Sequence, residues 1–424
     1  DVSNLGWKSG GIGSNFILIP SGNSTIIEGT FAYSSYLIKL EETLLQPRQS
    51  GVNGFNLGLN FTSFQNENEI RYGLEILGYQ TDFDFTNATG IQIEQKENST
   101  ELSGFIRYKV KKGKFIFDPG VRIYKYNSLP ATFEPRLGAK FLASERLRLK
   151  LAAGKYSQNL VSTNSDQDVV NLFYGFLSAP DNLPDEFRGE EVENGLQTAN
   201  HLIVGMEYDI SNKVDFNIEG YVKDFTQLTN INKNKLTGSD PDFIVEEGLA
   251  KGVDFVLKYN DPKIYFWLVY SLGHISRTGE EITYNPHFDR RHNVNLVSTY
   301  RFGADKSWSF DARWNLGSGF PFTQTQGFYP NLDFSDGIDT EYTSETGGLG
   351  ILYAGLNEGR LPWYHRLDIA LKKTHDLSKN SKFEWNVGVT NLYNRENIFY
   401  FNRIEYKRVN QLPIMPSAGM SLSF

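Results

Sequence analysis

The residue types that most often carry catalysis or bind metal ions are scattered along this chain. No Gly-x-Ser-x-Gly nucleophile elbow occurs, and Ser318 has no catalytic partner that the sequence identifies. The histidines include no pair at helical metal-ligand spacing, so we interpret them as ordinary polar or interfacial residues: His201, His274, His287, His292, His365 and His375. Cysteine is absent, which excludes a disulfide framework and a thiolate metal site. We therefore predict no enzymatic activity, no cofactor and no resident metal.

One acidic tract, Asp185 to Glu193, offers oxygen ligands that could bind Ca²⁺. Its spacing matches no EF-hand, and we favour a solvated acidic loop over a calcium site. The formal net charge of the whole chain is -8, which argues against nucleic-acid binding because phosphate recognition needs a basic surface.

Composition indicates strands and turns rather than helices. Among the 424 residues are 31 Phe, 23 Tyr and 39 Gly, and such a mixture suits pleated strands joined by turns. The mean hydropathy is -0.41, and no apolar run approaches the ~20 residues of a membrane helix. The sequence opens at Asp1 without the charged and apolar regions of a signal peptide, so we expect one to have been removed or the chain to be part of a longer precursor.

Apolar side chains recur at every second position in run after run. Leu367, Ile369 and Leu371 alternate with polar or small residues, and the stretch Trp308 to Leu316 gives the clearest case. In a soluble sheet such a face meets a core, whereas in an outer-membrane barrel it meets lipid and the other face lines a wet interior. Alternation alone does not separate these alternatives.

The connections between the runs favour the barrel. About 17 extended runs are visible, many of them near the ~10 residues that cross a bilayer at a tilt. Long loops alternate with short polar turns at 20–23, 65–69, 111–114, 144–146, 210–213, 259–263, 303–307 and 376–382. Short turns at one end and long loops at the other are typical of an outer-membrane barrel. We predict an all-β fold, a transmembrane antiparallel up-and-down β-barrel that occupies residues 1–424 as one domain. Because bacterial barrels normally have an even number of strands, we expect at least one further strand upstream.

The barrel prediction assigns side chains to faces. Trp308, Trp314, Trp385 and Tyr300 should face lipid near the interfaces, where amphipathic rings are favoured. Charged residues on the opposite face should point into the lumen and pair with one another and with a plug, or else contact substrate: Arg301, Asp311, Arg313, Arg366 and Asp368. Aromatic residues of the external loops are candidate substrate contacts, with packing among the loops as the alternative: Phe173, Tyr174, Phe320, Phe322, Phe328 and Tyr329. A short helix is predicted over Asp168 to Leu177.

Three C-terminal motifs are more specific than alternation. They are Gly359-Arg-Leu-Pro-Trp-Tyr-His-Arg-Leu-Asp368, Asn386-Val-Gly-Val-Thr-Asn-Leu-Tyr-Asn394, and Gln411-Leu-Pro-Ile-Met-Pro-Ser-Ala-Gly419 before the terminal Phe424. Together with Tyr284-Asn-Pro-His-Phe-Asp-Arg-Arg-His-Asn293 and Gly154-Lys-Tyr-Ser-Gln158, they resemble the C-terminal part of TonB-dependent outer-membrane receptors. The resemblance covers essentially the whole chain as barrel.

The resemblance implies a barrel of about 22 strands, of which this chain would supply the C-terminal three-quarters or so, without the plug domain and the first strands. It implies an outer-membrane transport receptor that binds a scarce solute at external loops and lumen and imports it with TonB-derived energy. Implied partners are outer-membrane lipid, the plug and TonB system, a small-molecule or oligomeric solute, and a surface lipoprotein or other outer-membrane protein. It also implies that Met420, Leu422 and Phe424 form the C-terminal assembly signal.

Two other functions remain open at this stage. A passive porin-like pore or a loop-rich surface-binding barrel would need no energy coupling. A barrel hydrolase would need a lumenal Ser or His with a carboxylate in reach, and the sequence identifies no such constellation. The identity of the solute is not encoded in a recognisable motif, because siderophores, cobalamin, glycans and peptides all suit aromatic, acidic loops.

The face assignment predicts the effect of two neighbouring substitutions. Trp314→Arg should place a charge against lipid and destabilise the folded barrel by ~2–4 kcal/mol if the residue lies near the midplane. Arg313→Gln, which changes the lumenal face, should have little effect on folding. Equal tolerance of the two variants in a urea-unfolding assay in lipid vesicles would contradict the assignment.

Overall fold

We describe a computed structural model of the chain. It describes residues 3–424 apart from residues 23, 43–44, 88–90, 128, 164–172, 174, 179, 234, 332–347, 379 and 404–405. In this described part, no helix is long and apolar enough to cross a membrane. The described segments form strands, turns and irregular loops.

A single antiparallel sheet dominates the fold, as predicted. It contains 18 strands, one of which is the two-residue β17 (Thr283–Tyr284). The other strands are β1 (Ser3–Leu18), β2 (Thr25–Glu42), β3 (Leu45–Gln65), β4 (Asn68–Thr86), β5 (Gln92–Lys112), β6 (Phe115–Tyr126), β7 (Thr132–Leu142), β8 (Leu147–Gln158), β13 (Gln197–Ser211), β14 (Val214–Ile231), β15 (Phe243–Asn260), β16 (Ile264–Thr278), β18 (His292–Phe302), β19 (Trp308–Gly317), β24 (Tyr364–Asp376), β25 (Lys382–Thr390) and β28 (Met415–Ser423).

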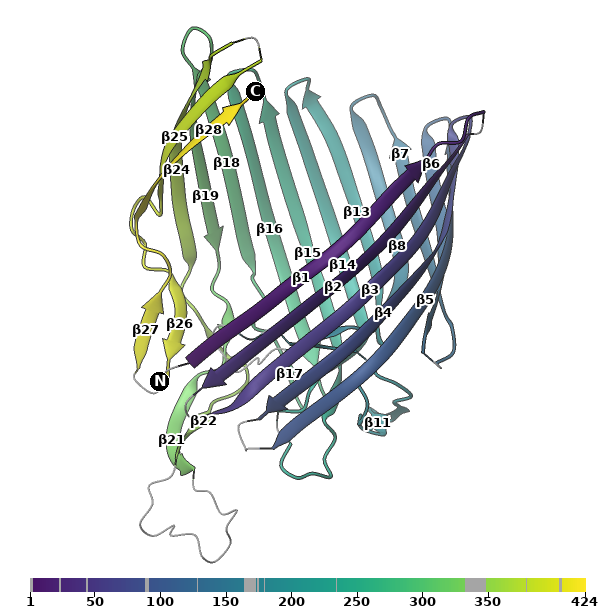
Figure 1. Ribbon diagram of the computed structural model, residues 1–424, viewed down its shortest axis with the longest axis vertical. Helices are drawn as coiled ribbons and strands as arrows, with labels where there is room; N and C mark the ends of the chain where they lie inside the picture. Colours follow the sequence, from purple (N-terminus) through teal and green to yellow (C-terminus); the bar gives the residue numbers. More distant parts are fainter. Residues whose placement is uncertain are drawn as a thin grey trace, which may run out of the picture.

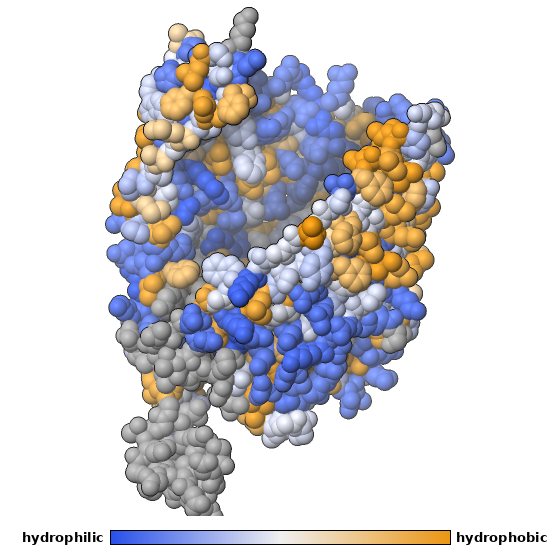
Figure 2. All heavy atoms as spheres, viewed as in Figure 1, coloured by the Kyte–Doolittle hydropathy of each residue, from blue (hydrophilic) through white to orange (hydrophobic). Residues whose placement is uncertain are grey.

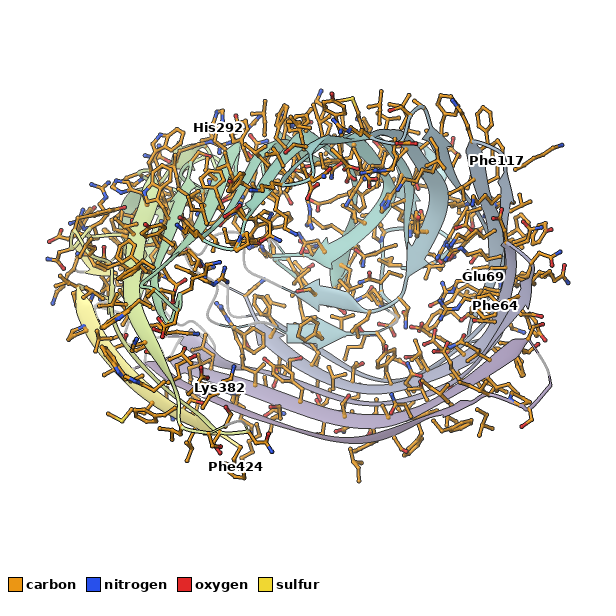
Figure 3. The ribbon with its side chains drawn as sticks, turned by 90° about the horizontal axis from the view of Figure 1, so that it is seen from above. Phe64, Glu69, Phe117, His292, Lys382 and Phe424 are labelled. Atoms are coloured by element: carbon orange, nitrogen blue, oxygen red, sulfur yellow. The ribbon has the colours of Figure 1, made fainter. Side chains whose placement is uncertain are left out.

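Each long strand pairs with the next long strand along the chain. This connectivity is the up-and-down meander that the alternation predicted. Figure 1 shows the tilted strands curving around a central space, and Figure 3 shows the ring-shaped outline from above. Among the described residues β1 pairs only with β2, and β28 pairs only with β25.

The two faces of the sheet differ in chemistry. On β4, Tyr72, Leu74 and Ile76 point outward and are 41%, 62% and 37% exposed to solvent, while Arg71 and Glu75 point inward. Arg71 Nη2 lies 3.4 Å from a carboxylate oxygen of Glu28 on β2, and Figure 2 shows a largely hydrophilic interior and an apolar band on the outer wall. An apolar exterior around a polar interior is the arrangement that lipid requires.

Aromatic rings mark the lipid boundary at the short-turn end. A chain of ring contacts lies on the outward faces of β18, β19 and β25. It leads from Tyr300 through Phe302 and Trp308 to Trp385, and neighbouring ring centroids are 5.6–5.9 Å apart. A second group, Phe115, Phe117 and Phe141, stacks beside another short turn. Amphipathic rings are favoured at membrane interfaces, and Tyr300, Trp308 and Trp385 lie where the sequence predicted them.

The connections segregate by length. The short turns gather at the upper end in Figure 1 and the longer loops at the lower end. The turn at Gly113 needs a residue with positive φ, here 59°, which glycine adopts without steric cost. The lower end also carries small hairpins: β9 (Val161–Thr163) with β10 (Gly175–Leu177), β11 (Glu186–Phe187) with β12 (Glu190–Glu191), β20 (Pro321–Phe322) with β23 (Gly359–Arg360), β21 (Thr325–Asn331) with β22 (Gly348–Tyr353), and β26 (Ile398–Asn402) with β27 (Lys407–Asn410).

Two local predictions were wrong. The polar stretch Thr86 to Asn98 separates two alternating runs in the sequence and is predicted to lie outside the strands, but its part Gln92 to Asn98 extends β5. Inward residues there, such as Ile93, pack among loops rather than against lipid. The end of the predicted helix, Gly175–Leu177, is strand β10 and pairs with β9. Residues 168–172 and 174 of that prediction lie outside the described residues.

The C-terminal motif residues form an edge strand and a tight loop. Met420 lies opposite Trp385, and Leu422 lies opposite Phe383, both on the outward face. The preceding loop is organised by Asn391, which is fully buried and has a φ of 53°. Its Nδ2 donates to the carbonyl oxygens of Arg395 and Leu412 at 2.9 and 3.1 Å, and its backbone N–H donates to Asp368 at 2.9 Å.

We predict that Asn391→Ala destabilises the folded protein by about 2–4 kcal/mol, because it leaves buried carbonyl groups unpaired and places a Cβ residue at positive φ without side-chain compensation. Asn391→Gly should lose less, since it keeps the backbone conformation. Urea unfolding in detergent micelles measures the free energy of unfolding of both variants. Equal stability of the alanine variant and the natural protein would show that the loop does not depend on this side chain.

Candidate functional site

The lumenal wall near the short turns is held by a network of charges. Glu207 on β13 accepts contacts from Lys140, Arg148 and Lys150 at 2.8, 2.9 and 3.0 Å. Arg148 also donates to Asp209 at 2.6 Å. The strands β7, β8 and β13 present these residues on one face because their register places every second side chain inward. Such mutual pairing fixes the charges in place on the wall.

Closer to the long loops, a buried carboxylate binds two arginines. The Glu134 side chain is fully buried on β7, and its oxygens lie 3.3 Å from Arg122 and 2.8 Å from Arg136. It also accepts from the backbone N–H of Ser157 on β8 at 3.1 Å. A carboxylate that accepts several charge-assisted hydrogen bonds is compensated for its burial. Side-chain contacts to Glu134 therefore connect β6, β7 and β8 at this level.

The loop between β8 and β13 folds inward over β3 and β4. The hydroxyl of Ser50 on β3 bonds the backbone of Phe176 at 3.0 and 2.8 Å, and Thr81 on β4 bonds Ser178 at 3.2 Å. Apolar side chains from the lumenal wall and the loops pack into a buried cluster, which we call the mouth cluster: Ile38, Leu40, Phe83, Phe85, Ile93, Val161, Phe173, Leu177, Ile231 and Phe243. Short strands inside the ring are visible from above in Figure 3. The loop thus narrows the long-loop end of the barrel.

The loop between β14 and β15 is anchored in the same region. The backbone carbonyl of Lys235 accepts from Asn87 at 2.8 Å, and the Lys235 ammonium contacts Asp242 at 2.6 Å. In this loop Asp240 accepts from the backbone N–H groups of Thr237 and Leu236, and these bonds hold the pKa of the Asp240 carboxyl below its usual range. Loop and wall are therefore joined by several polar contacts.

A cavity of about 580 Å³ opens on the inner wall beside these loops. We call it the wall cavity. Its lining combines both signs of charge with apolar surface: Ile203, Glu219, Tyr221, Lys223, Phe225, Leu228, Gly248, Ala250, Asp254, Ile275, Ser276, Arg277 and Phe288. Gly248 and Ala250 leave room because they carry little or no side chain. A concave site with an apolar floor and a few polar groups is the usual form of a small-molecule site.

The charged groups of the wall cavity are supported by neighbours. Arg277 lies 3.4 Å from Glu246, whose other oxygen accepts from Tyr284 at 2.8 Å. The Arg277 guanidinium also lies over the ring of Phe288, 5.7 Å from its centroid. Lys223 lies 5.6 Å from the ring centroid of Tyr221. These contacts orient two cations at the cavity without burying either completely.

The motif 284–293 meets the motif 359–368 through one buried acid. Asp289 is fully buried and contacts Arg291 at 3.1 Å and Arg360 at 2.7 Å. Its other oxygen accepts from the backbone N–H of Ile275 at 2.9 Å. We call this arrangement the Asp289 clamp. It joins the loop before β18 to the long connection before β24, and so fixes Phe288 at the wall cavity.

The structure places the predicted lumenal charges on one face of β18, β19 and β24. Arg313 lies directly opposite Asp368, and Arg366 Nη2 contacts Asp368 at 2.9 Å. Asp311 accepts from Thr299 and, at 3.3 Å, from Ser309. Arg301 and Arg313 are solvent-exposed. None of these residues lines the wall cavity.

The predicted loop aromatics do not form one site. As a candidate substrate contact Phe173 would need an exposed ring, but it is 5% exposed and belongs to the mouth cluster; Tyr174 lies outside the described residues. Phe322 stacks on Phe401 and Phe328 packs edge-on against Tyr406. The ring centroid of Phe320 lies 4.0 Å from Cζ of the Arg290 guanidinium, and Tyr329 is exposed. The alternative interpretation, packing among loops, describes four of these residues: Phe173, Phe320, Phe322 and Phe328.

No group of three or more His, Asp or Glu side chains in the described ranges could hold a metal ion. The tract Asp185 to Glu193 forms the small β11–β12 hairpin, and its Arg188 contacts Glu247 at 2.6 Å. Sequence reasoning missed Lys223, Arg277 and Phe288 as site residues. The only signal for them was the 284–293 motif, which contains Phe288.

The fold matches solved outer-membrane transport proteins. The chain aligns with the ferric-catecholate import receptor Fiu from Escherichia coli K12 over 99% of its length, with a TM-score of 0.65 and 11% identity. It aligns over 99% with the ferric citrate transporter FecA, at a TM-score of 0.62 and 12% identity, and with the outer membrane transporter YddB from Escherichia coli, at 0.60 and 9%. The chain spans 64%, 62% and 63% of those three proteins.

These alignments establish that the chain has the barrel fold of TonB-dependent receptors. No family model and no curated protein sequence matches it. Sequence identities of 9–12% carry the architecture and leave the solute undetermined.

The Asp289 clamp yields a prediction about loop order. Asp289→Ala leaves Arg291 and Arg360 without their carboxylate and should destabilise this region by about 3–5 kcal/mol. Limited proteolysis of intact cells should then cleave the connection between β19 and β24 faster than in the natural protein. Asp376→Ala, which removes an exposed ion pair with Lys382 at the opposite end, should leave the cleavage rate unchanged. Identical rates for all three proteins would contradict the clamp.

Proposed function

We propose that this chain supplies the barrel wall, residues 1–424, of an outer-membrane transport receptor. The receptor binds a scarce solute at its external loops and lumen and imports it with energy from the TonB system. A plug domain and further strands are the expected partners within the natural protein. The barrel fold shared with proteins named as transporters and import receptors supports this role, and we infer no enzymatic step.

The observation that carries the proposal is the wall cavity. It lies on the lumenal face, beside inward-folded loops, and presents the cations Lys223 and Arg277 next to the rings of Tyr221 and Phe288. Cations and aromatic faces recognise solutes that combine anionic or oxygen-rich groups with flat apolar parts. Ferric catecholates, which name one of the similar proteins, combine both features, and ferric citrate, which names another, supplies the anionic groups.

A passive pore or a surface-binding barrel would share this wall, and energy dependence separates the functions. The chromosomal gene is deleted and restored on a plasmid, and the cells are then supplied with radiolabelled ferric citrate, ferric catecholate, cobalamin or oligosaccharide. We expect accumulation of one of these solutes that stops when a protonophore dissipates the proton gradient. Accumulation that continues unchanged would establish passive diffusion, and surface binding without accumulation would establish a binding barrel.

The wall cavity makes a prediction about affinity. Lys223→Gln should raise the Kd of the transported solute about tenfold or more, because it removes a charge-assisted contact. The matched control is Lys251→Gln, since Lys251 lies beside Val222 on the adjacent strand but on the outward face. Isothermal titration with the purified whole protein measures both. Equal Kd values for Lys223→Gln and the natural protein would remove Lys223 from the solute site.

A further inference from the structure

An apolar groove lies on the outward face of β13 to β16, on the opposite side of the wall from the lumen. Its volume is about 570 Å³. The ladder places Gly220 between Val204 of β13 and Val253 of β15. A Cβ atom built on Gly220 would meet nothing closer than 3.9 Å, so the glycine leaves a recess in the wall. Val204, Val222 and Leu272 beside it are 51%, 44% and 42% exposed, and the groove therefore opens toward lipid.

Two cationic residues, Lys251 and Arg291, and a histidine border this groove. Lys251 on β15 lies directly opposite His274 on β16, and both line the groove together with Arg291. Lys251 is exposed, and none of the described carboxylates forms an ion pair with it. The Nδ1 atom of His274 is buried without a hydrogen-bond partner. An outward-facing lysine on a membrane barrel is otherwise unfavourable, so its position calls for a compensating ligand.

The border remains positive after its acidic neighbours are considered. Asp289 is the acid that contacts Arg291, but it is shared with Arg360, and one carboxylate between two guanidinium groups leaves a net positive charge. Glu247, the next acid along β15 on the outward face, is paired with Arg188 at 2.6 Å. The groove therefore suits an anionic group.

Lys251 lies inside the apolar band but close to its long-loop edge, from where a lysine side chain can extend to the lipid headgroups. Lys251 precedes Tyr259, at the short-turn end of β15, by eight residues. At about 3.3 Å per residue and a tilt near 40°, this places Lys251 about 20 Å from that end of an apolar band about 25 Å tall. Nearby, the hydroxyl of Tyr270 bonds His292 at 2.9 Å and Trp363 stacks on His292, as expected of the second interfacial belt.

We propose that this groove binds a phosphate-bearing acyl lipid of the outer leaflet. One acyl chain lies across Gly220 between Val204 and Val253, and the phosphate lies against Lys251, His274 and Arg291. The apolar recess matches the chain, and the cations match the anionic headgroup. The inference rests on the membrane orientation in the proposed function but does not involve the solute site.

The test uses the whole natural protein in nanodiscs of phosphatidylcholine containing a minor fraction of phosphatidylglycerol with the same acyl chains. Native mass spectrometry after release from the nanodisc counts the retained anionic lipid. We expect one preferentially retained phosphatidylglycerol per protein, and a loss of at least about tenfold in retention for Lys251→Gln. Gly220→Leu, which fills the recess without touching a charge, should also reduce retention.

Lys223→Gln is the matched control, because it removes the same charge from the lumenal face of the neighbouring strand and should leave retention unchanged. Inorganic phosphate added in excess should not displace the lipid, since it cannot occupy the apolar recess. Equal retention of phosphatidylglycerol and phosphatidylcholine, or an equal loss in Lys223→Gln, would overturn the proposal. Heat-modified gel mobility verifies that each variant is folded. Because retention is measured without solute, failure here leaves the uptake result unaffected, and the converse also holds.

Discussion

The structure depends on the backbone hydrogen bonds that join each strand to the next. In hydrocarbon an unpaired N–H or C=O group costs several kcal/mol, so the chain can cross a membrane only if every strand has neighbours. Consecutive antiparallel pairing meets this requirement for the strands between β1 and β28, with few register shifts, while among the described residues β1 and β28 are each paired on one side. Once the register is set, every second side chain is committed to lipid and the others to the lumen, and the remaining chemistry is arranged within that division.

This division explains what the sequence could and could not predict. The period of two identifies Leu74 and Trp314 as outward residues, and polar turn residues mark the hairpin ends. The sequence does not show where strands continue beyond the membrane. Around Ile93 the apolar side chain lies on the inward face and packs against loops, so the alternation no longer marks a lipid-facing side. The wall cavity also escapes detection, since Lys223, Arg277 and Phe288 are far apart in sequence and are brought together only by strand pairing and the Asp289 clamp.

The lumenal charges are arranged to limit mutual repulsion and desolvation. Glu134 and Asp289 are fully buried, and each contacts two arginines. Glu207 contacts three cations on neighbouring strands. Such networks fix the polar part of the wall, whereas buried apolar packing on the lumenal side is found in the mouth cluster at the long-loop end. They leave Lys223 at the open wall cavity, where its contact is with the ring of Tyr221.

The Asp289 clamp has a consequence for the order in which the protein folds. Hairpins between consecutive strands close over short sequence separations, and such local pairing forms quickly. The contact between Asp289 and Arg360 spans 71 residues and requires β18, β19 and β24 to be in register first. Its formation therefore comes late in assembly. The clamp forms only when the strands are paired in the correct register. In a misregistered intermediate the long connection before β24 would therefore be accessible to surface proteases.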